Sequence, residues 1–177
     1  DIGNDVKIGN SGNVYVATCF SDTADFDPTL GISTQISKGS FDCGLLKLNS
    51  MGNLIWIKTF GGIGWDQCPS IVLDESENVF STGRFSDTVD FDPGTGVYDL
   101  ISEGSDIYVL KLDSSGNFIW VKNMGGDGSN LGQSISRSDS GDLCISGAFM
   151  DTIDFNPGLG VFNLISKGAQ DAFVLLL

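Results

Sequence analysis

Three stretches of the chain decide its fold: Asn13–Phe20 reads NVYVATCF, Asn78–Phe85 reads NVFSTGRF and Asp142–Phe149 reads DLCISGAF. They start 65 and then 64 residues apart. The same register aligns DFDP at residues 25–28 and 90–93 with DFNP at residues 154–157. Agreement of this kind over three copies indicates an internal repeat, and a repeat of this length is typical of stacked supersecondary units.

Each complete copy contains four short segments with the composition of β-strands. The segments are rich in Val, Ile, Phe, Tyr and Trp, and clusters such as the DSSGN of residues 113–117 separate them. The Gly of such a cluster supplies the positive φ that a short antiparallel connection needs. We therefore expect antiparallel strands in three repeats, at residues 1–62, 63–126 and 127–177, and the third repeat lacks its last strand.

The strand predicted at residues 106–112 indicates how the repeats pack. One face carries Tyr108, Leu110 and Leu112, and the other carries Ile107 and Val109. A small sheet that is apolar on both faces needs a sheet neighbour on each side, whereas a two-sheet sandwich would expose polar outer faces. We predict an all-β fold, a partial β-propeller with four-stranded blades. The β-trefoil, β-prism and β-solenoid fit less well, because their units are shorter.

A complete propeller has about four to eight blades, so three repeats do not close a ring. We expect the remaining blades to come from flanking sequence or from another subunit. The apolar sequence VLLL at residues 174–177 reads as the middle of a strand, which favours a piece of a longer chain.

Several segments resemble the bacterial β-propeller repeats called SBBP repeats, whose unit looks like SIAVDSSGNVYVTG followed by DAFVLKLDSSGNLVWSKTFGG. The matching segments are SIVLD at 70–74, NVFSTG at 78–83, DIYVLKLD at 106–113 and GNFIWVK at 116–122. The DTVDFDPGTG segment at 87–96 is similar to a variant found in large secreted bacterial proteins. The resemblance implies an extracellular or cell-surface location and a role in adhesion, scaffolding or ligand display. It implies no reaction and no catalytic residue.

The charge of the chain narrows its partners. There are 23 Asp and Glu against 9 Lys and Arg, which gives a net charge of −14. Such a surface repels phosphate backbones, so we expect no nucleic-acid partner. No apolar run is long enough to span a membrane. The chain contains no His, which excludes Ser-His-Asp and Cys-His nucleophile systems and His-based metal sites.

The repeated acidic motif is the sharpest candidate for a metal site. Hard oxygen ligands at this spacing suit Ca²⁺, the only cofactor that the sequence suggests. Asp and Asn before Pro also form ordinary turns, because their side chains bond nearby backbone N–H groups. We favour the turn and retain calcium as the alternative. The candidate ligands are Asp22, Asp25, Asp27, Asp87, Asp90, Asp92, Asp151, Asp154 and Asn156.

Non-repeating loops and cysteines give the other candidate sites. Residues 62–69 and 126–132 join consecutive repeats, and ligand contacts are predicted there for Trp65, Asp66, Asp127 and Asn130. The four cysteines fall at four different positions of the unit, so they form no repeated metal site. We expect the cysteines to be buried small residues. The alternative is a bridge between Cys19 and Cys43, if they lie on neighbouring strands of the first repeat in an oxidising compartment.

Three functions remain open. The first is a non-catalytic binding, interaction or scaffold module of a secreted or cell-surface bacterial protein, with a protein or glycan as ligand. The second is a polysaccharide-active enzyme domain, which would need a carboxylate pair unique to one repeat. The third is a structural spacer stiffened by calcium. Because the acidic residues recur in every repeat, we favour a non-catalytic module.

Overall fold

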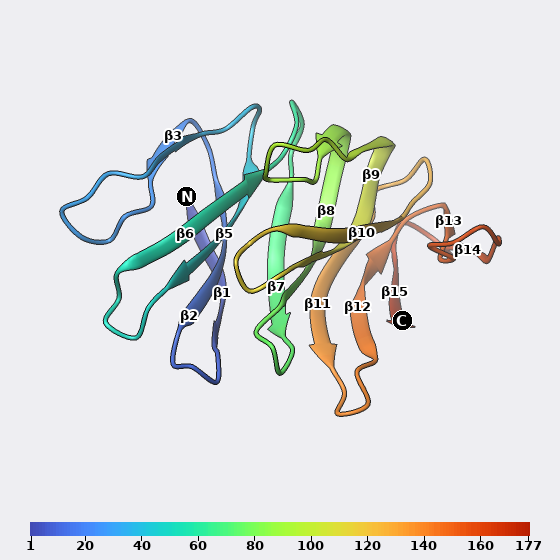
Figure 1. Ribbon diagram of the computed structural model, residues 1–177. Helices are drawn as coiled ribbons and strands as arrows, with labels where there is room; N and C mark the ends of the chain where they lie inside the picture. The colour runs from blue at the N-terminus through green and yellow to red at the C-terminus, as the bar shows by residue number, and fades with distance from the viewer.

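The computed structural model describes all 177 residues, which form β-strands and no helix (Figure 1). The strands are β1 (Ile2–Ile8), β2 (Val14–Phe20), β3 (Thr23–Asp25), β4 (Thr34–Ile36), β5 (Asp42–Leu48), β6 (Leu54–Phe60), β7 (Gln67–Leu73), β8 (Val79–Asp90), β9 (Asp99–Leu112), β10 (Phe118–Met124), β11 (Leu131–Arg137), β12 (Leu143–Phe149), β13 (Thr152–Asp154), β14 (Asn163–Ile165) and β15 (Asp171–Leu176). The predicted all-β class is confirmed.

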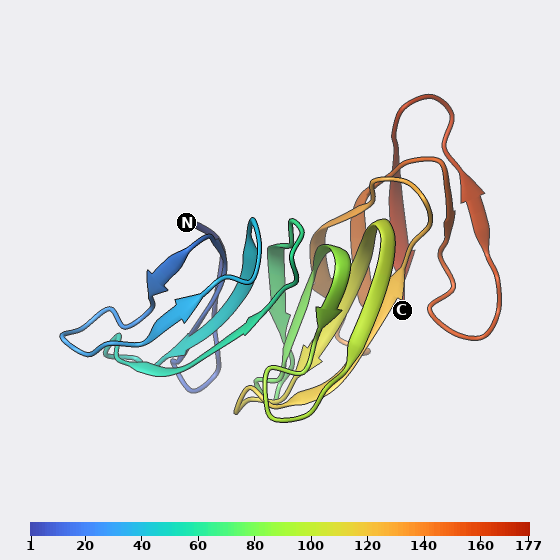
Figure 2. The ribbon, with the colours of Figure 1, turned by 90° about the horizontal axis from the view of Figure 1, so that it is seen from above.

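The strands form three main sheets, and every neighbouring pair within them is antiparallel. The first sheet has the order β1-β2-β5-β6, the second has the order β7-β8-β9-β10, and the third has the order β11-β12-β15. The sheets lie side by side in chain order, with the second between the other two (Figure 2). We call them sheet 1, sheet 2 and sheet 3.

Two core clusters fill the spaces between the sheets. Tyr108, Leu110 and Leu112 of β9 belong to the cluster between sheets 1 and 2, whereas Ile107 and Val109 belong to the cluster between sheets 2 and 3. All five side chains are fully buried. The alternation expected for this strand is therefore confirmed, and it makes sheet 2 apolar on both faces.

Most of the hairpin turns contain a Gly in the left-handed region, as the sequence predicted. Gly12, Gly52, Gly116 and Gly141 have φ between 80° and 100°. The β7–β8 turn differs, because Glu77 stands at this position with a φ of 60°. A side chain in this conformation costs roughly 1 kcal/mol, so the surroundings of Glu77 must offset that cost.

Each repeat extends an arm from its second and third main strands. The arms are the separate two-stranded hairpin β3–β4 in the first repeat, the outer parts of β8 and β9 in the second, and the separate two-stranded hairpin β13–β14 in the third (Figure 1). The Phe of the acidic motif points into the core: Phe91 is fully buried, and its ring centroid lies 5.2 Å from Phe85 and 5.4 Å from Phe60 of sheet 1.

The first strand of a sheet packs against the preceding sheet, and the contact repeats. β7 packs on β1, β2 and β5, and β11 packs on β7, β8 and β9. At the first contact the backbone N–H of Ile71 donates to Asp5 Oδ2 over 3.0 Å. At the second, the N–H of Ile135 donates to Ser70 Oγ over 3.3 Å. Equivalent positions of successive repeats thus make equivalent bonds.

Candidate functional site

An aromatic side chain and a cation meet at the linker between sheets 1 and 2. Trp65 lies in this linker and is 49% exposed. The guanidinium carbon of Arg84, from β8, lies 4.2 Å from the centroid of the Trp65 ring. The register of the sheets makes Cys19 and Ala148 the equivalents of Arg84, so the pair occurs in one repeat only.

The backbone of Trp65 is held by contacts with two neighbouring segments. The N–H of Trp65 donates to Ser86 Oγ over 3.0 Å, and its backbone forms a parallel bridge with Phe41. The Phe41 ring centroid lies 6.3 Å from that of Trp65. The Trp65 ring is therefore held on one side by protein and is half open on the other.

Arg84 is a cation without an ion-pair partner. No carboxylate lies within salt-bridge distance of its guanidinium, and its buried Nε atom has no hydrogen-bond acceptor. Burial lowers the pKa of Arg84, although the charge of Asp66 opposes this. A guanidinium offers a planar fork of donors that suits carboxylates, and it stacks on aromatic rings. The Trp65–Arg84 pair thus presents a ring face beside an unsatisfied cation.

Asp66, predicted as a ligand contact, is fully buried and holds the linker instead. Its Oδ2 accepts from the N–H of Gly62 over 2.8 Å, and its Oδ1 accepts from the N–H of Ser86 over 3.0 Å. Burial raises the pKa of Asp66 to about 6, against the lowering effect of these two bonds. Because the Asp66 side chain is not accessible, the structure gives its predicted ligand contact no support, and that contact stays a prediction.

The linker between sheets 2 and 3 repeats this arrangement with an amide. Asn130 is fully buried, and its Oδ1 accepts from the N–H of Met150 over 3.2 Å. Its burial likewise gives the ligand contact predicted for Asn130 no support, and that contact stays a prediction. Asp127 is exposed, but no aromatic residue replaces Trp65 here, since Ser129 occupies the equivalent bridge position.

The acidic motifs have the same turn geometry in all three arms. Asp25 Oδ1 accepts from the N–H groups of Asp27 and Ser33, over 3.1 and 2.8 Å. Asp90 and Asp154 make the equivalent pairs of bonds. The third residue of each motif caps the next turn, as Asp27 Oδ1 does by accepting from the N–H of Thr29. These carboxylates satisfy backbone donors of their own loops, as the turn interpretation requires.

The remaining candidate ligands, Asp22, Asp87 and Asp151, have φ of 56°, 60° and 60°. Asp adopts this left-handed conformation more readily than most residues, which accounts for its recurrence where the arm leaves the sheet. No group of three or more Cys, Asp or Glu side chains is placed to hold a metal ion. Calcium binding by these residues stays a prediction.

Three cysteines gather between sheets 1 and 2. Cys19 and Cys43 are direct cross-strand partners in β2 and β5, as the predicted bridge requires, and their thiols are free. The hydrogen bond with the Cys43 thiol is the largest influence on the pKa of Cys19 and lowers it, whereas burial raises it. Bonds from the N–H of Cys68 and from Asn4 lower it further, to about 7.

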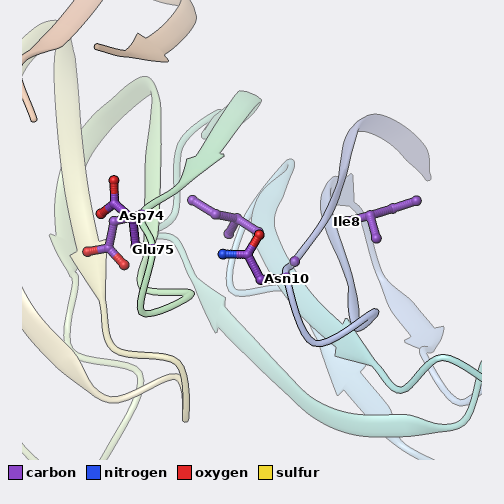
Figure 3. A pocket seen from close by; sticks show the side chains of 6 residues that line it. Ile8, Asn10, Asp74 and Glu75 are labelled. Carbon is purple, nitrogen blue, oxygen red and sulfur yellow. The ribbon is translucent and has the colours of Figure 1, made fainter. Parts of the chain in front are cut away.

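A polar pocket of about 230 Å³ lies at the opposite end of β7 from Trp65. Ile8 and Asn10 line it from sheet 1, and Asp74 and Glu75 line it from the β7–β8 turn (Figure 3). Both carboxylates already have partners, because Asp74 accepts from Asn78 and Glu75 pairs with Arg137 over 2.8 Å. The pocket therefore offers little unsatisfied chemistry.

The same turn carries Glu77, a residue whose role the sequence analysis missed. Its carboxylate reaches sheet 1, where it accepts from the N–H of Ser11 over 2.6 Å and from the hydroxyl of Tyr15 over 2.9 Å. Lys47 Nζ lies 3.8 Å away. Burial raises the pKa of Glu77, but the bonds from Ser11 and Tyr15 outweigh it and lower the pKa to about 2. Glu77 thus ties sheet 2 to sheet 1.

No family model matches the chain, and no curated protein matches it in sequence. The structure contains no helix of the length and apolarity that crossing a membrane requires.

Proposed function

We propose that the three sheets are consecutive blades of a β-propeller of the SBBP type. Three observations support this: each sheet is an antiparallel meander, the first strands of sheets 2 and 3 pack on the preceding sheet, and both faces of sheet 2 are apolar. A propeller is the architecture in which every blade meets two neighbours in this way. The exported or cell-surface location that the resemblance implies is part of the same proposal.

The function that we propose is non-catalytic ligand binding at the Trp65–Arg84 pair. The observation that carries it is the unpaired guanidinium of Arg84 beside a half-exposed ring, in a chain where acidic residues greatly outnumber basic ones. Leaving a partly buried cation unpaired costs stability, and such a cost is typical of a residue kept for binding. The repeat could place a small residue at this position without loss, as it does with Ala148.

The chemistry of the pair defines the ligand class. The ring favours a flat or apolar face, such as that of a sugar, and the guanidinium favours one carboxylate beside it. The net charge of −14 disfavours polyanions, because long-range repulsion would oppose their approach. We therefore propose a glycan or peptide segment with a single acidic group next to an apolar face.

The enzyme alternative has weaker support. Burial is the main cause of the raised pKa of Asp66, and the nearby charge of Asp42 raises it further. Both are buried, and neither lines any of the three pockets. Carboxylates that cleave a glycosidic bond must reach the substrate. The calcium-stiffened spacer remains a proposal that metal titration tests.

The test is a binding screen with oligosaccharides and short peptides that carry one carboxylate, each paired with its uncharged amide or reduced form. We expect Trp65→Ala and Arg84→Ala each to weaken binding of the acidic probes at least tenfold, while Tyr98→Ala, another half-exposed aromatic residue, leaves it unchanged. Equal binding of charged and uncharged probes, or binding that survives both substitutions, would exclude this site.

A further inference from the structure

Each arm is a two-stranded ribbon with one buried face and one open face. In the arm of the second repeat, Val89 is fully buried, whereas its neighbour Thr88 is exposed and pairs with Ile101 across the ribbon. Successive side chains of a strand point to opposite faces, so Thr88 and Ile101 lie on the open face. The equivalent pairs of the other two arms are Thr23 with Ile36 and Thr152 with Ile165.

The open face carries large apolar side chains at the same positions in all three arms. The Ile that pairs with Thr is 71% exposed in the first arm, 71% in the second and 70% in the third. Four residues earlier, an Ile or Val is 82%, 74% and 74% exposed. Single exposed apolar residues are ordinary, whereas apolar residues gathered on one surface mark interaction sites. The six residues are Ile32, Ile36, Val97, Ile101, Val161 and Ile165.

Strand formation alone does not require Ile or Val on this face. Thr has the same branched shape and a similar preference for strands, and it already occupies the facing position of each ribbon. Thr in place of Ile101 would form the same ribbon without exposing a hydrocarbon side chain. The repeated apolar side chains therefore indicate a contact outside the ribbon.

Neighbouring sheets of the same kind do not supply that contact. The second repeat has a sheet on each side (Figure 2), and core clusters fill both spaces between them. Val97 and Ile101 of its arm are nevertheless exposed, to nearly the same extent as their equivalents in the other two arms. The open face thus remains open in a repeat that has both of its neighbours.

The arms are acidic as well as apolar. Residues 21–41, 86–105 and 150–170, which contain the three arms, hold ten Asp and Glu and two Lys. Ten negative and two positive charges give −8 of the net −14 of the chain. The open faces therefore suit a partner that is basic as well as apolar.

The second arm places two of these charges directly opposite each other. Asp99 lies between Val97 and Ile101 in the sequence and pairs with Asp90 across the ribbon. Like charges at such a pair are destabilising, and no salt bridge joins either carboxylate to a cation of the chain. Asp90 bonds its own loop through Oδ1 alone. A basic side chain from a partner would relieve this repulsion.

We propose that the open faces of the arms bind an extended peptide segment of a partner protein, in which basic side chains lie between apolar ones. Val97, Asp99 and Ile101 follow each other at intervals of two residues, which is the period of one face of a strand. A partner strand with the same period places apolar side chains on Val97 and Ile101 and a Lys or Arg beside Asp99. A second copy of this chain fits less well, because two acidic arms repel each other.

The test is a titration of fluorescently labelled peptides with the 177-residue chain. The probe has the sequence Val-Ser-Lys-Ser-Val-Ser-Lys-Ser-Val, whose Val and Lys side chains share one face when the peptide is extended. One control peptide has Glu in place of Lys, and the other has Ser in place of Val. We expect the probe to bind at least tenfold more tightly than either control, and its affinity to fall as salt is added. Absence of probe binding, or equal binding of either control, overturns the proposal.

A variant of the chain assigns the binding to the arms. The substitutions Ile36→Thr, Ile101→Thr and Ile165→Thr together keep the branched shape at exposed positions, so the variant should fold, which circular dichroism checks. We expect it to bind the probe at least tenfold more weakly than the unaltered chain. The matched control replaces three exposed apolar residues outside the arms by Thr and should bind normally; these are Ile8, Met51 and Ile63. Binding that survives in the arm variant, or that both variants lose equally, overturns the proposal.

Vesicles of neutral phosphatidylcholine distinguish a peptide partner from a membrane surface, because exposed Ile and Val side chains also suit a lipid interface. We expect the chain not to sediment with these vesicles. Sedimentation that the arm variant loses would overturn the proposal in favour of a membrane. Neither Trp65 nor Arg84 lies in an arm, so failure of ligand binding at that pair leaves this test unaffected.

Discussion

Replacement of Glu77 by Gln should loosen sheet 2 from sheet 1. The carboxylate lies between the two sheets, where Ser11, Tyr15 and Lys47 surround it. Lowering its pKa from 4.5 to about 2 is worth about 3 kcal/mol of folding free energy. Gln has nearly the same volume and accepts some of these bonds without the charge, so we expect a loss of about 2–3 kcal/mol at pH 7.

The contribution of Glu77 to the free energy of unfolding should change with pH in a defined direction. The pKa of Glu77 is lower in the folded chain than in the unfolded chain. Its contribution is therefore complete above the unfolded value of 4.5, decreases as the pH falls, and is lost near pH 2. The stability difference between the unaltered chain and Glu77→Gln should stay constant from pH 8 to pH 5 and then shrink toward zero.

Urea unfolding, followed by tryptophan fluorescence at fixed protein concentration, measures the effect. With a urea dependence of roughly 2–3 kcal/mol per M, the midpoint should fall by about 1 M. Glu75→Gln is the control, because Glu75 is two residues away, with a side chain that is 74% exposed, and little change is expected. A midpoint shift that is absent at pH 7, or that persists unchanged down to pH 2, would refute the role assigned to Glu77.

Three further predictions concern the linker and the arms. Asp66→Asn places in this linker the amide that Asn130 has in the next one. Because the pKa of Asp66 is raised from 3.8 to about 6 in the folded chain, the substitution should stabilise the chain by up to about 3 kcal/mol above pH 6. In urea titrations this gain should vanish below pH 4. Phe91→Ala empties a fully buried site and should cost about 4 kcal/mol by the same assay. Calcium in place of a chelator should leave the melting temperature unchanged, since backbone N–H groups bond Asp90; a rise of several degrees, lost in Asp90→Ala, would assign calcium to the motif.

The features that the sequence predicted correctly are local. Alternation within residues 106–112 placed Tyr108 and Val109 on opposite buried faces, because the side-chain direction of a strand follows from neighbouring residues. The Gly turns were predictable for the same reason. The repeat then carried these assignments from one sheet to the next.

The features that were missed depend on contacts between distant segments. The buried carboxylate of Asp66 accepts from the N–H of Ser86, and the ring of Trp65 contacts Arg84, each about 20 positions away. One signal was available for Arg84: it is the one charged residue at a repeat position that is otherwise small. The position of Glu77, where other copies have Gly, was a second such signal.

These two departures from the repeat call for opposite interpretations. Glu77 violates a local rule, since its φ of 60° suits Gly, but its bonds to sheet 1 offset that cost. Arg84 also carries a cost, because its buried Nε has no hydrogen-bond acceptor within the chain; the Trp65 ring and the charge of Asp66 offset that cost only in part. In a protein built from copies, a costly departure with an internal compensation is explained by folding. A costly departure that the chain offsets only in part is the ground on which we propose a ligand at Arg84 and Trp65.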